Sequence, residues 1–135
     1  MSYIGRCNCE SIRVTLPEKP PTSSICQCTN CKRSSGGVCS IHYMVDEADI
    51  KLEDPSSALK TYNDPRSLSG NVVRVQTIGM FANKNSPIMS NSPKAPGKAF
   101  VKAALFDMVS PPGRMVFNEK QPEWLKFLDQ SGKPI

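Results

Sequence analysis

Two clusters of cysteine are the residues of this chain whose type and spacing can do chemistry. Cys7 and Cys9 form a Cys-x-Cys pair, and Cys26, Cys28 and Cys31 follow as a Cys-x-Cys-x-x-Cys triplet. A thiolate is a soft ligand that suits zinc. A tetrahedral zinc with three protein ligands keeps one position for water or substrate, as catalytic zinc sites do. The triplet therefore indicates an open metal site, and we expect the function to lie there.

The spacing of the cysteines allows two arrangements of ligands. In one, the Cys-x-Cys pair joins two of the later cysteines in a closed structural site. In the other, the triplet forms its own open site, and the pair needs partners elsewhere. Reduced cysteines without a metal are the alternative to both. The sixth cysteine, Cys39, stands apart, and an isolated cysteine is more often a small buried hydrophobic residue than a ligand.

Three further side chains are candidates for catalysis because they lie near the triplet in sequence. Lys32 and Arg33 follow Cys31 directly, and His42 is the only histidine of the chain. Histidine can exchange a proton near neutral pH, and the two cations can contact an anionic substrate. The competing interpretations are a hydrogen-bonded structural histidine and two solvated surface charges.

Composition narrows the class of protein. The chain has 135 residues, of which 39% are hydrophobic and 21% charged, so we expect one globular domain over residues 1–135. The net charge of +5 comes from scattered lysines and arginines rather than from a basic stripe, which argues against nucleic-acid binding. No apolar run is long enough to span a bilayer, and the start lacks the apolar stretch of a signal peptide. We therefore expect a cytoplasmic protein that is not bound to a membrane, with reduced thiols.

Short apolar segments separated by proline-rich turns make up most of the chain. Alternating or β-branched patterns predict strands at 11–16, 38–45, 50–52, 59–62, 71–81, 99–106 and 114–117. The triplet is expected in a tight loop that ends at residues 34–37. Only residues 122–128 read as a helix, with Pro122 in its first turn. The pattern predicts an all-β fold of short antiparallel sheets with a short C-terminal helix.

At the cysteine clusters the sequence resembles a known family. Residues 5–9 (Gly-Arg-Cys-Asn-Cys) and 26–36 (Cys-Gln-Cys-Thr-Asn-Cys-Lys-Arg-Ser-Ser-Gly) are similar to the glutathione-dependent formaldehyde-activating enzyme (GFA) family, which includes centromere protein V. The similarity continues in family order at 81, 85–88, 92–98, 106–107 and 122–124, and so spans nearly the whole chain.

The resemblance carries expectations about fold and site. It implies a tent-like all-β fold with two zinc sites. Cys26, Cys28 and Cys31 would hold the catalytic zinc, and Cys7 and Cys9 would join a later Cys-x-x-Cys-Gly-Ser-Pro motif to hold a structural zinc. Family members of this type are carbon–sulfur lyases that act on the glutathione adduct of formaldehyde.

The sequence departs from the family pattern at the second half of the structural site. The expected Phe-Cys-x-x-Cys-Gly-Ser-Pro reads Phe-Ala-Asn-Lys-Asn-Ser-Pro at 81–87, without either cysteine. Alanine cannot bind zinc, and a neutral asparagine is a poor ligand. We therefore predict that the site of Cys7 and Cys9 is incomplete, with apolar packing or a disulfide in place of the structural zinc, and that one zinc binds per chain.

Three functions are compatible with the sequence. The first is a zinc-dependent lyase that makes or breaks a C–S or C–O bond of a small-molecule adduct, with dehydration included and glutathione as a candidate co-substrate. The second is a metal-free enzyme for elimination, isomerisation or cyclisation of a small natural-product intermediate. The third is a non-catalytic interaction module, against which the complete triplet argues. The sequence leaves a homodimer open.

Overall fold

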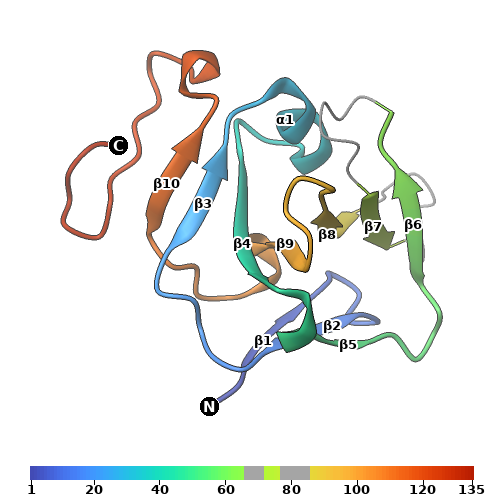
Figure 1. Cartoon of the computed structure of the whole chain (residues 1–135). Coiled ribbons are helices and arrows are strands. Elements are labelled where there is room, and N and C mark those ends of the chain that lie inside the picture. The colour runs from blue at the N-terminus through green and yellow to red at the C-terminus, as the bar shows by residue number, and fades with distance from the viewer. Residues whose placement is uncertain (66–71, 77–85) are drawn as a thin grey trace.

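The strands of the computed structural model, which describes residues 1–65, 72–76 and 86–135, form two sheets (Figure 1). A three-stranded sheet contains β1 (Tyr3–Arg6), β2 (Arg13–Leu16) and β5 (Lys51–Glu53) in the order β1-β2-β5. A seven-stranded sheet has the order β10-β3-β4-β9-β8-β7-β6. Its strands are β3 (Ser23–Cys26), β4 (Ser40–Asp46), β6 (Leu59–Asn63), β7 (Val72–Gln76), β8 (Ser86–Asn91), β9 (Lys98–Lys102) and β10 (Pro112–Val116). The all-β prediction is confirmed.

All strand pairs in both sheets are antiparallel except β10 with β3, which is parallel. A long connection leads from β9 to β10, so no tight hairpin constrains the direction of β10. The sequence did not predict strands β1, β3 and β8. In β1 (Tyr-Ile-Gly-Arg) and β3 (Ser-Ser-Ile-Cys) apolar and polar residues do not alternate, so neither segment shows the strand pattern. Of the predicted strand 71–81, residues 72–76 form β7 and the rest lie outside the described residues.

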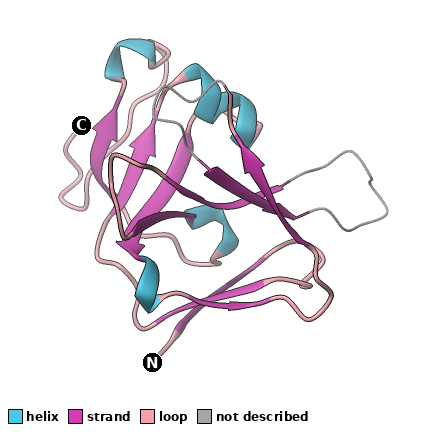
Figure 2. Ribbon diagram, turned by 45° about the vertical axis from the view of Figure 1, so that its right-hand side comes forward, coloured by secondary structure: helices cyan, strands magenta, loops and turns pink. Residues whose placement is uncertain are grey.

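The prediction of a C-terminal helix at 122–128 is wrong, because the structure has no helix there. These residues form a turn and then an irregular segment (Figure 2). Leu128 pairs with Pro134 in an isolated β-bridge, and the amide of Ile135 donates to the carbonyl of Phe127 at 3.1 Å. The end of this segment thus pairs with the last residues of the chain rather than continuing as a helix.

Among the described residues the single α-helix is α1 (Thr29–Ser35), within the segment that the sequence predicted to be a loop. Its N-cap is Cys28, whose Sγ accepts a hydrogen bond from the amide of Cys31 at 3.2 Å. Its C-cap is Gly36, in the left-handed conformation at φ 69° that glycine adopts without strain. The helix is short enough that caps rather than an apolar stripe define it. Three single turns of 3₁₀ helix complete the described part of the structure, at Glu47–Asp49, Ala103–Leu105 and Asn118–Lys120.

The core lies between the two sheets and is built by alternation along the strands. On β4, Ile41, Tyr43 and Val45 pack toward the core, and on β9 Val101 does the same. The core is completed by side chains from β2 and β8 and from the loops between strands. Its fully or nearly fully buried members include Ile12, Val14, Leu16, Ala58, Ile88, Met89, Ala103 and Phe106.

A cluster of aromatic rings joins the sheets. Tyr3 of β1 stacks on Phe106 at a centroid distance of 4.1 Å, and Tyr43 of β4 meets both rings edge-on. The Tyr43 hydroxyl is 3.1 Å from the Tyr3 hydroxyl and accepts a hydrogen bond from the Ser110 amide at 2.8 Å. The backbone of Gly5 comes so close to Phe106 that an added Cβ would lie 3.0 Å from its ring. This cluster fixes β4, which carries part of the cavity described below.

The substitution Tyr43→Phe tests this link between the sheets. It leaves the ring in place but leaves the buried Ser110 amide without its acceptor, which typically costs about 1–3 kcal/mol. We expect the free energy of unfolding in urea to fall by that amount. Tyr3→Phe removes a hydroxyl at a partly exposed position and should cost less. Equal losses in the two variants would contradict the role assigned to Tyr43.

Candidate metal centre and cavity

The three cysteines of the triplet meet at the junction of β3 and α1. Cys26 is the last residue of β3, Cys28 caps α1, and Cys31 lies in the first turns of the helix. All three Sγ atoms lie within 4.8 Å of one another, and no other group of ligating residues in the described part of the chain converges in this way. The strand end and the helix cap therefore bring together the residues that spacing alone could only suggest.

The donor set fits a zinc ion. Zn–S bonds of about 2.3 Å in a tetrahedron place ligand sulfurs about 3.8 Å apart, so Sγ atoms already within 4.8 Å need only small shifts. The three thiols are half-buried rather than fully enclosed. Three thiolates from the protein leave a fourth position, and the group belongs to the open type of site.

Hydrogen bonding within the triplet favours a thiolate. The hydrogen bond from Cys31 lowers the pKa of the Cys26 thiol to about 6, with smaller contributions from hydrogen bonds of Cys28 and then from the charge of Lys102, although burial opposes the shift. The same hydrogen bond, followed by burial, raises the pKa of Cys31. At neutral pH and without a metal, Cys26 is therefore the anionic member of the group, with Cys31 as its donor.

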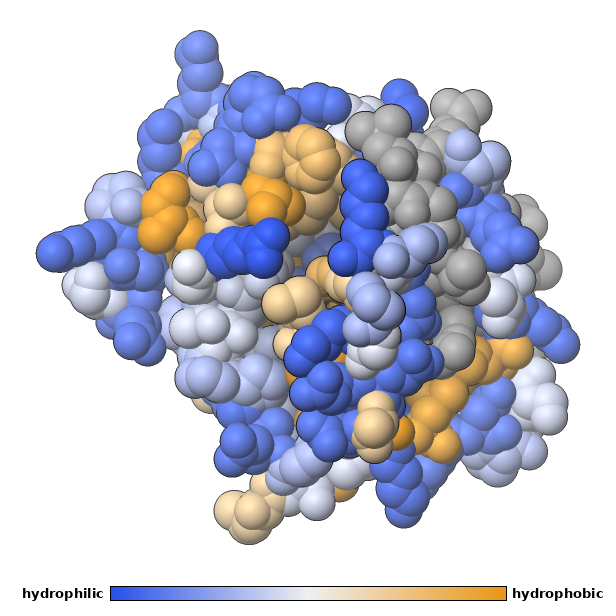
Figure 3. All heavy atoms as spheres, in the orientation of Figure 1, coloured by the Kyte–Doolittle hydropathy of each residue, from blue (hydrophilic) through white to orange (hydrophobic). Residues whose placement is uncertain are grey.

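A cavity of about 430 Å³ opens beside the triplet. Cys26 and Cys31 line it, and the rest of its wall comes mainly from β3, β4, β8, β9 and β10. Its apolar lining is Ile25, Met44, Ala95, Phe100, Val116 and Phe117, and its other polar lining is Ser24, His42, Ser90, Ser92, Lys94 and Arg114. Figure 3 shows apolar side chains gathered over β10 and β3, bordered by hydrophilic ones. An apolar wall with a few polar groups is typical of a small-molecule site.

His42 lies in the wall of this cavity. Only 8% of the residue is exposed, and its Nε2 is 3.1 Å from the Oγ of Ser40. Burial, and to a smaller extent the charge of Lys102, lower the pKa of His42 to about 3. The imidazole is therefore neutral at physiological pH, so it offers one donor and one acceptor rather than a positive charge.

Lys102 lies close enough to the triplet for its charge to interact with the cysteines, and the sequence did not single it out. It is the register partner of His42 across β4 and β9, and its Nζ donates to the Oγ of Ser40. Burial lowers the pKa of Lys102, whereas the charges of the neighbouring cysteines raise it. The signal in the sequence is that Lys102 is the only charged residue of the apolar segment 99–106. A lysine in such a segment is almost never buried without a partner. Arg114 and Lys94 carried no comparable signal.

Lys32 and Arg33 lie on α1, outside the lining of the cavity. Lys32 donates from Nζ to the backbone carbonyl of Lys120, and Arg33 is exposed. The structure thus brings His42 to the cavity and places the other two candidates on the helix. Cys39 is outside the triplet, and burial raises the pKa of its thiol.

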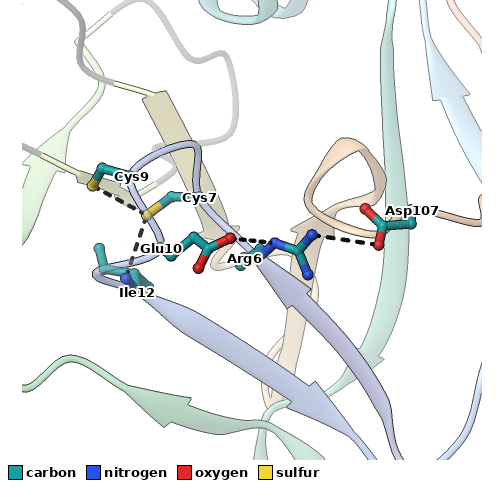
Figure 4. A network of polar contacts seen from close by, with 6 residues as sticks. All are labelled: Arg6, Cys7, Cys9, Glu10, Ile12 and Asp107. Carbon is teal, nitrogen blue, oxygen red and sulfur yellow. Dashed lines mark hydrogen bonds and ion pairs between the residues drawn. The ribbon is translucent and has the colours of Figure 1, made fainter.

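Cys7 and Cys9 do not join the triplet and lie in the loop that follows β1 (Figure 4). Their Sγ atoms are 3.7 Å apart, well beyond the length of a disulfide bond. Cys7 is 3% exposed, packs in the core, and accepts a hydrogen bond from the Ile12 amide at 3.3 Å. The segment that replaces the second cysteine pair, 81–85, lies outside the described residues. Of the two replacements that the sequence left open for the structural zinc, the structure shows Cys7 in apolar packing and no disulfide to Cys9, and the loss of the zinc itself stays a prediction.

An ion pair holds the loop that carries these two cysteines. Arg6 contacts Glu10 at 3.1 Å within the loop and Asp107 at 3.7 Å across from it (Figure 4). All three side chains are largely exposed, so the pairs position the loop more than they stabilise the fold.

The fold and the site define an all-β protein of two sheets, with a three-cysteine group that could hold zinc beside a small-molecule cavity. The chain belongs to the GFA family: the family model described as "Glutathione-dependent formaldehyde-activating enzyme" matches residues 2–125.

A crystal structure of a Rhodobacter sphaeroides protein is similar in fold, with a TM-score of 0.61 and 14% sequence identity. The match covers 84% of this chain and 99% of that one. No curated protein matches the sequence significantly. In the described part of the chain, no helix is long and apolar enough to cross a membrane.

The neutral state of His42 predicts a loss of stability on acidification. In the unfolded chain the imidazole takes up a proton near pH 6.5, whereas in the fold it does so only near pH 3. The unfolded state thus binds more protons between these values, and stability falls as the pH falls through this window. Between pH 7 and pH 5 we expect the wild type to lose roughly 2 kcal/mol more than His42→Gln.

Urea unfolding at both pH values measures this difference. Titration of Cys26 in the same range contributes to both proteins and cancels in the comparison. Parallel losses in wild type and variant would show that His42 is not held neutral by the fold.

Proposed function

We propose that this protein is a zinc-dependent lyase of the GFA type, which makes or breaks a C–S or C–O bond of a small anionic adduct. The observation that carries the proposal is the convergence of three cysteine Sγ atoms, within 4.8 Å, beside a cavity of about 430 Å³ that two of them, Cys26 and Cys31, line. Membership of a family of formaldehyde-activating enzymes supports an enzymatic role.

Cys26, Cys28 and Cys31 would hold the metal. A zinc ion there would act as a Lewis acid that stabilises negative charge developing on a substrate sulfur or oxygen. The group stands at the edge of the cavity rather than inside the core, so a substrate can reach it from one side.

The charges of the cavity favour an anionic substrate. Lys94 and Arg114 line it, whereas no acidic side chain does so among the described residues. Neither cation has an ion-pair partner in the described part of the chain. A carboxylate of the substrate can therefore pair with them, which fits a glutathione adduct as well as smaller carboxylated thiols.

The apolar side of the cavity has a second role. Val116 lines the cavity in register with Cys26, so this apolar side chain would keep water from the reacting end of the substrate, where a dry environment strengthens the interaction of charges and hydrogen bonds. The reduced thiols that such a site requires agree with a cytoplasmic location.

Metal content tests the proposal directly. Protein purified under reducing conditions without added zinc should contain about one zinc ion per chain by elemental analysis. Cys28→Ser should lose it, and serine remains a good N-cap, so that α1 should persist in far-UV circular dichroism. Cys39→Ser and Cys9→Ser, which change cysteines outside the triplet, are the matched controls and should keep the metal. Wild-type protein without zinc would overturn the lyase mechanism and favour metal-free catalysis in the same cavity.

Loss of the cavity cations should weaken substrate binding. With glutathione and formaldehyde as substrates, Arg114→Met and Lys94→Met should each raise KM about three- to tenfold, because each removes one partly exposed charge contact. The effect should shrink in high salt. Lys19→Met removes an exposed charge away from the cavity and serves as the control. An unchanged KM in both cavity variants would exclude an anionic substrate held at this rim.

A further inference from the structure

Lys102, Ser40 and His42 form a hydrogen-bonded chain whose geometry has a chemical consequence. Lys102 donates from Nζ to the Oγ of Ser40, and that oxygen is 3.1 Å from the Nε2 of His42. Ser40 is 2% exposed and His42 is 8% exposed, so both groups depend on protein partners rather than on water. The register of the sheet produces this contact: His42 pairs with Lys102 across β4 and β9, and Ser40 precedes His42 by two residues on the same face of β4.

The ammonium group decides the direction of the hydrogen bonds. It has three donors and no acceptor, so the Ser40 oxygen must accept from it. The hydroxyl hydrogen of Ser40 is then left to be donated, and His42 Nε2 is the acceptor within reach in the described part of the structure. If Nε2 carried the proton instead, a buried hydroxyl hydrogen would have no partner, which is unfavourable.

The other ring nitrogen, Nδ1, is left without a hydrogen-bond partner in the described part of the chain. His42 is part of the cavity wall. A ring that is neutral and has Nε2 as an acceptor carries its proton on Nδ1. A second positive charge on the ring would be opposed by the nearby Lys102 ammonium.

We propose that Lys102 and Ser40 are positioning residues that hold His42 as the neutral tautomer protonated at Nδ1, so that this N–H donates to an oxygen atom of the bound substrate. The role toward the substrate rests on the proposed function, whereas the tautomer does not. The oxygen would belong to a hydroxyl or carbonyl group on the substrate carbon that lies beside the triplet, because His42, Cys26 and Cys31 line the same cavity. Donation from a fixed neutral N–H stabilises negative charge on that oxygen without proton transfer.

Nuclear magnetic resonance of the full chain tests the tautomer without any substrate. His42 is the only histidine, so ¹⁵N-labelled protein without a histidine tag gives an unambiguous ring spectrum. Nε2 is the nitrogen that correlates with both ring C–H protons. At pH 7 we expect Nε2 to be unprotonated and Nδ1 to be protonated. A protonated Nε2, or protonation of both nitrogens, would overturn the proposal in the wild-type protein alone, before any variant is made.

Variants then test the chain of hydrogen bonds. Ser40→Ala removes the donor to Nε2, and Lys102→Met removes the cation that orients the hydroxyl, so both should shift His42 toward the other tautomer or a mixture. Ser24→Ala is the matched control: Ser24 is the register partner of His42 on β3 and lines the same cavity, but it is not in the chain. A tautomer unchanged in both Ser40→Ala and Lys102→Met would exclude them as positioning residues.

Kinetics address the donor role separately. His42→Phe should lower kcat for the glutathione and formaldehyde pair at least about tenfold, because the lost N–H stabilises charge that develops during the reaction. His42→Asn should recover part of the loss because its amide nitrogen lies near the position of Nδ1. Equal kcat values for wild type and His42→Phe would overturn the donor role. If the wild type turned over no substrate, the proposed function would fail, and the ring spectrum would still decide the tautomer.

Discussion

The alternation of side chains along β4 is the constraint on which the site depends. Odd-numbered residues from Ile41 to Val45 pack into the core between the sheets, and even-numbered residues from Ser40 to Met44 face the other way. A shift of one residue in register would exchange the two sets and place His42 in the aromatic cluster. The hydroxyl of Tyr43, bonded to the Ser110 amide and beside Tyr3, prevents such a shift. Core packing on one face of β4 thereby fixes the positions of the polar side chains on the other face.

The same sheet gives the cysteine triplet its surroundings. β3 ends at Cys26 between β4 on one side and β10 on the other, and Cys26 is in register with Ser40 and Val116. The polar chain from Lys102 through Ser40 therefore runs beside the strand end that carries the first cysteine. A cationic group near clustered thiols favours their ionised form, which is the form that binds metal. The cavity, the triplet and the half-buried Lys102 are thus parts of one arrangement around β3, β4 and β9.

The two cysteine groups have separate roles in this chain. The triplet lies at the cavity, whereas Cys7 packs in the core and lies 3.7 Å from Cys9 at the loop after β1. Burial of one thiol and a backbone hydrogen bond to its sulfur make Cys7 part of the packing. The loop is also held by the Arg6 contacts with Glu10 and Asp107, so its position does not depend on the cysteines alone (Figure 4).

The sequence by itself determined the all-β class, the triplet as a candidate metal site, and the family, because apolar alternation and ligand spacing are local patterns. It placed helix 122–128 wrongly and missed α1, since the end of a short helix is set by caps such as Cys28 and Gly36 rather than by an apolar stripe. It singled out His42 but not the groups that control it. Only the tertiary structure decided that Lys102, 60 positions away in the chain, lies opposite His42. The register between two strands depends on how the whole core packs, and no local pattern encodes it.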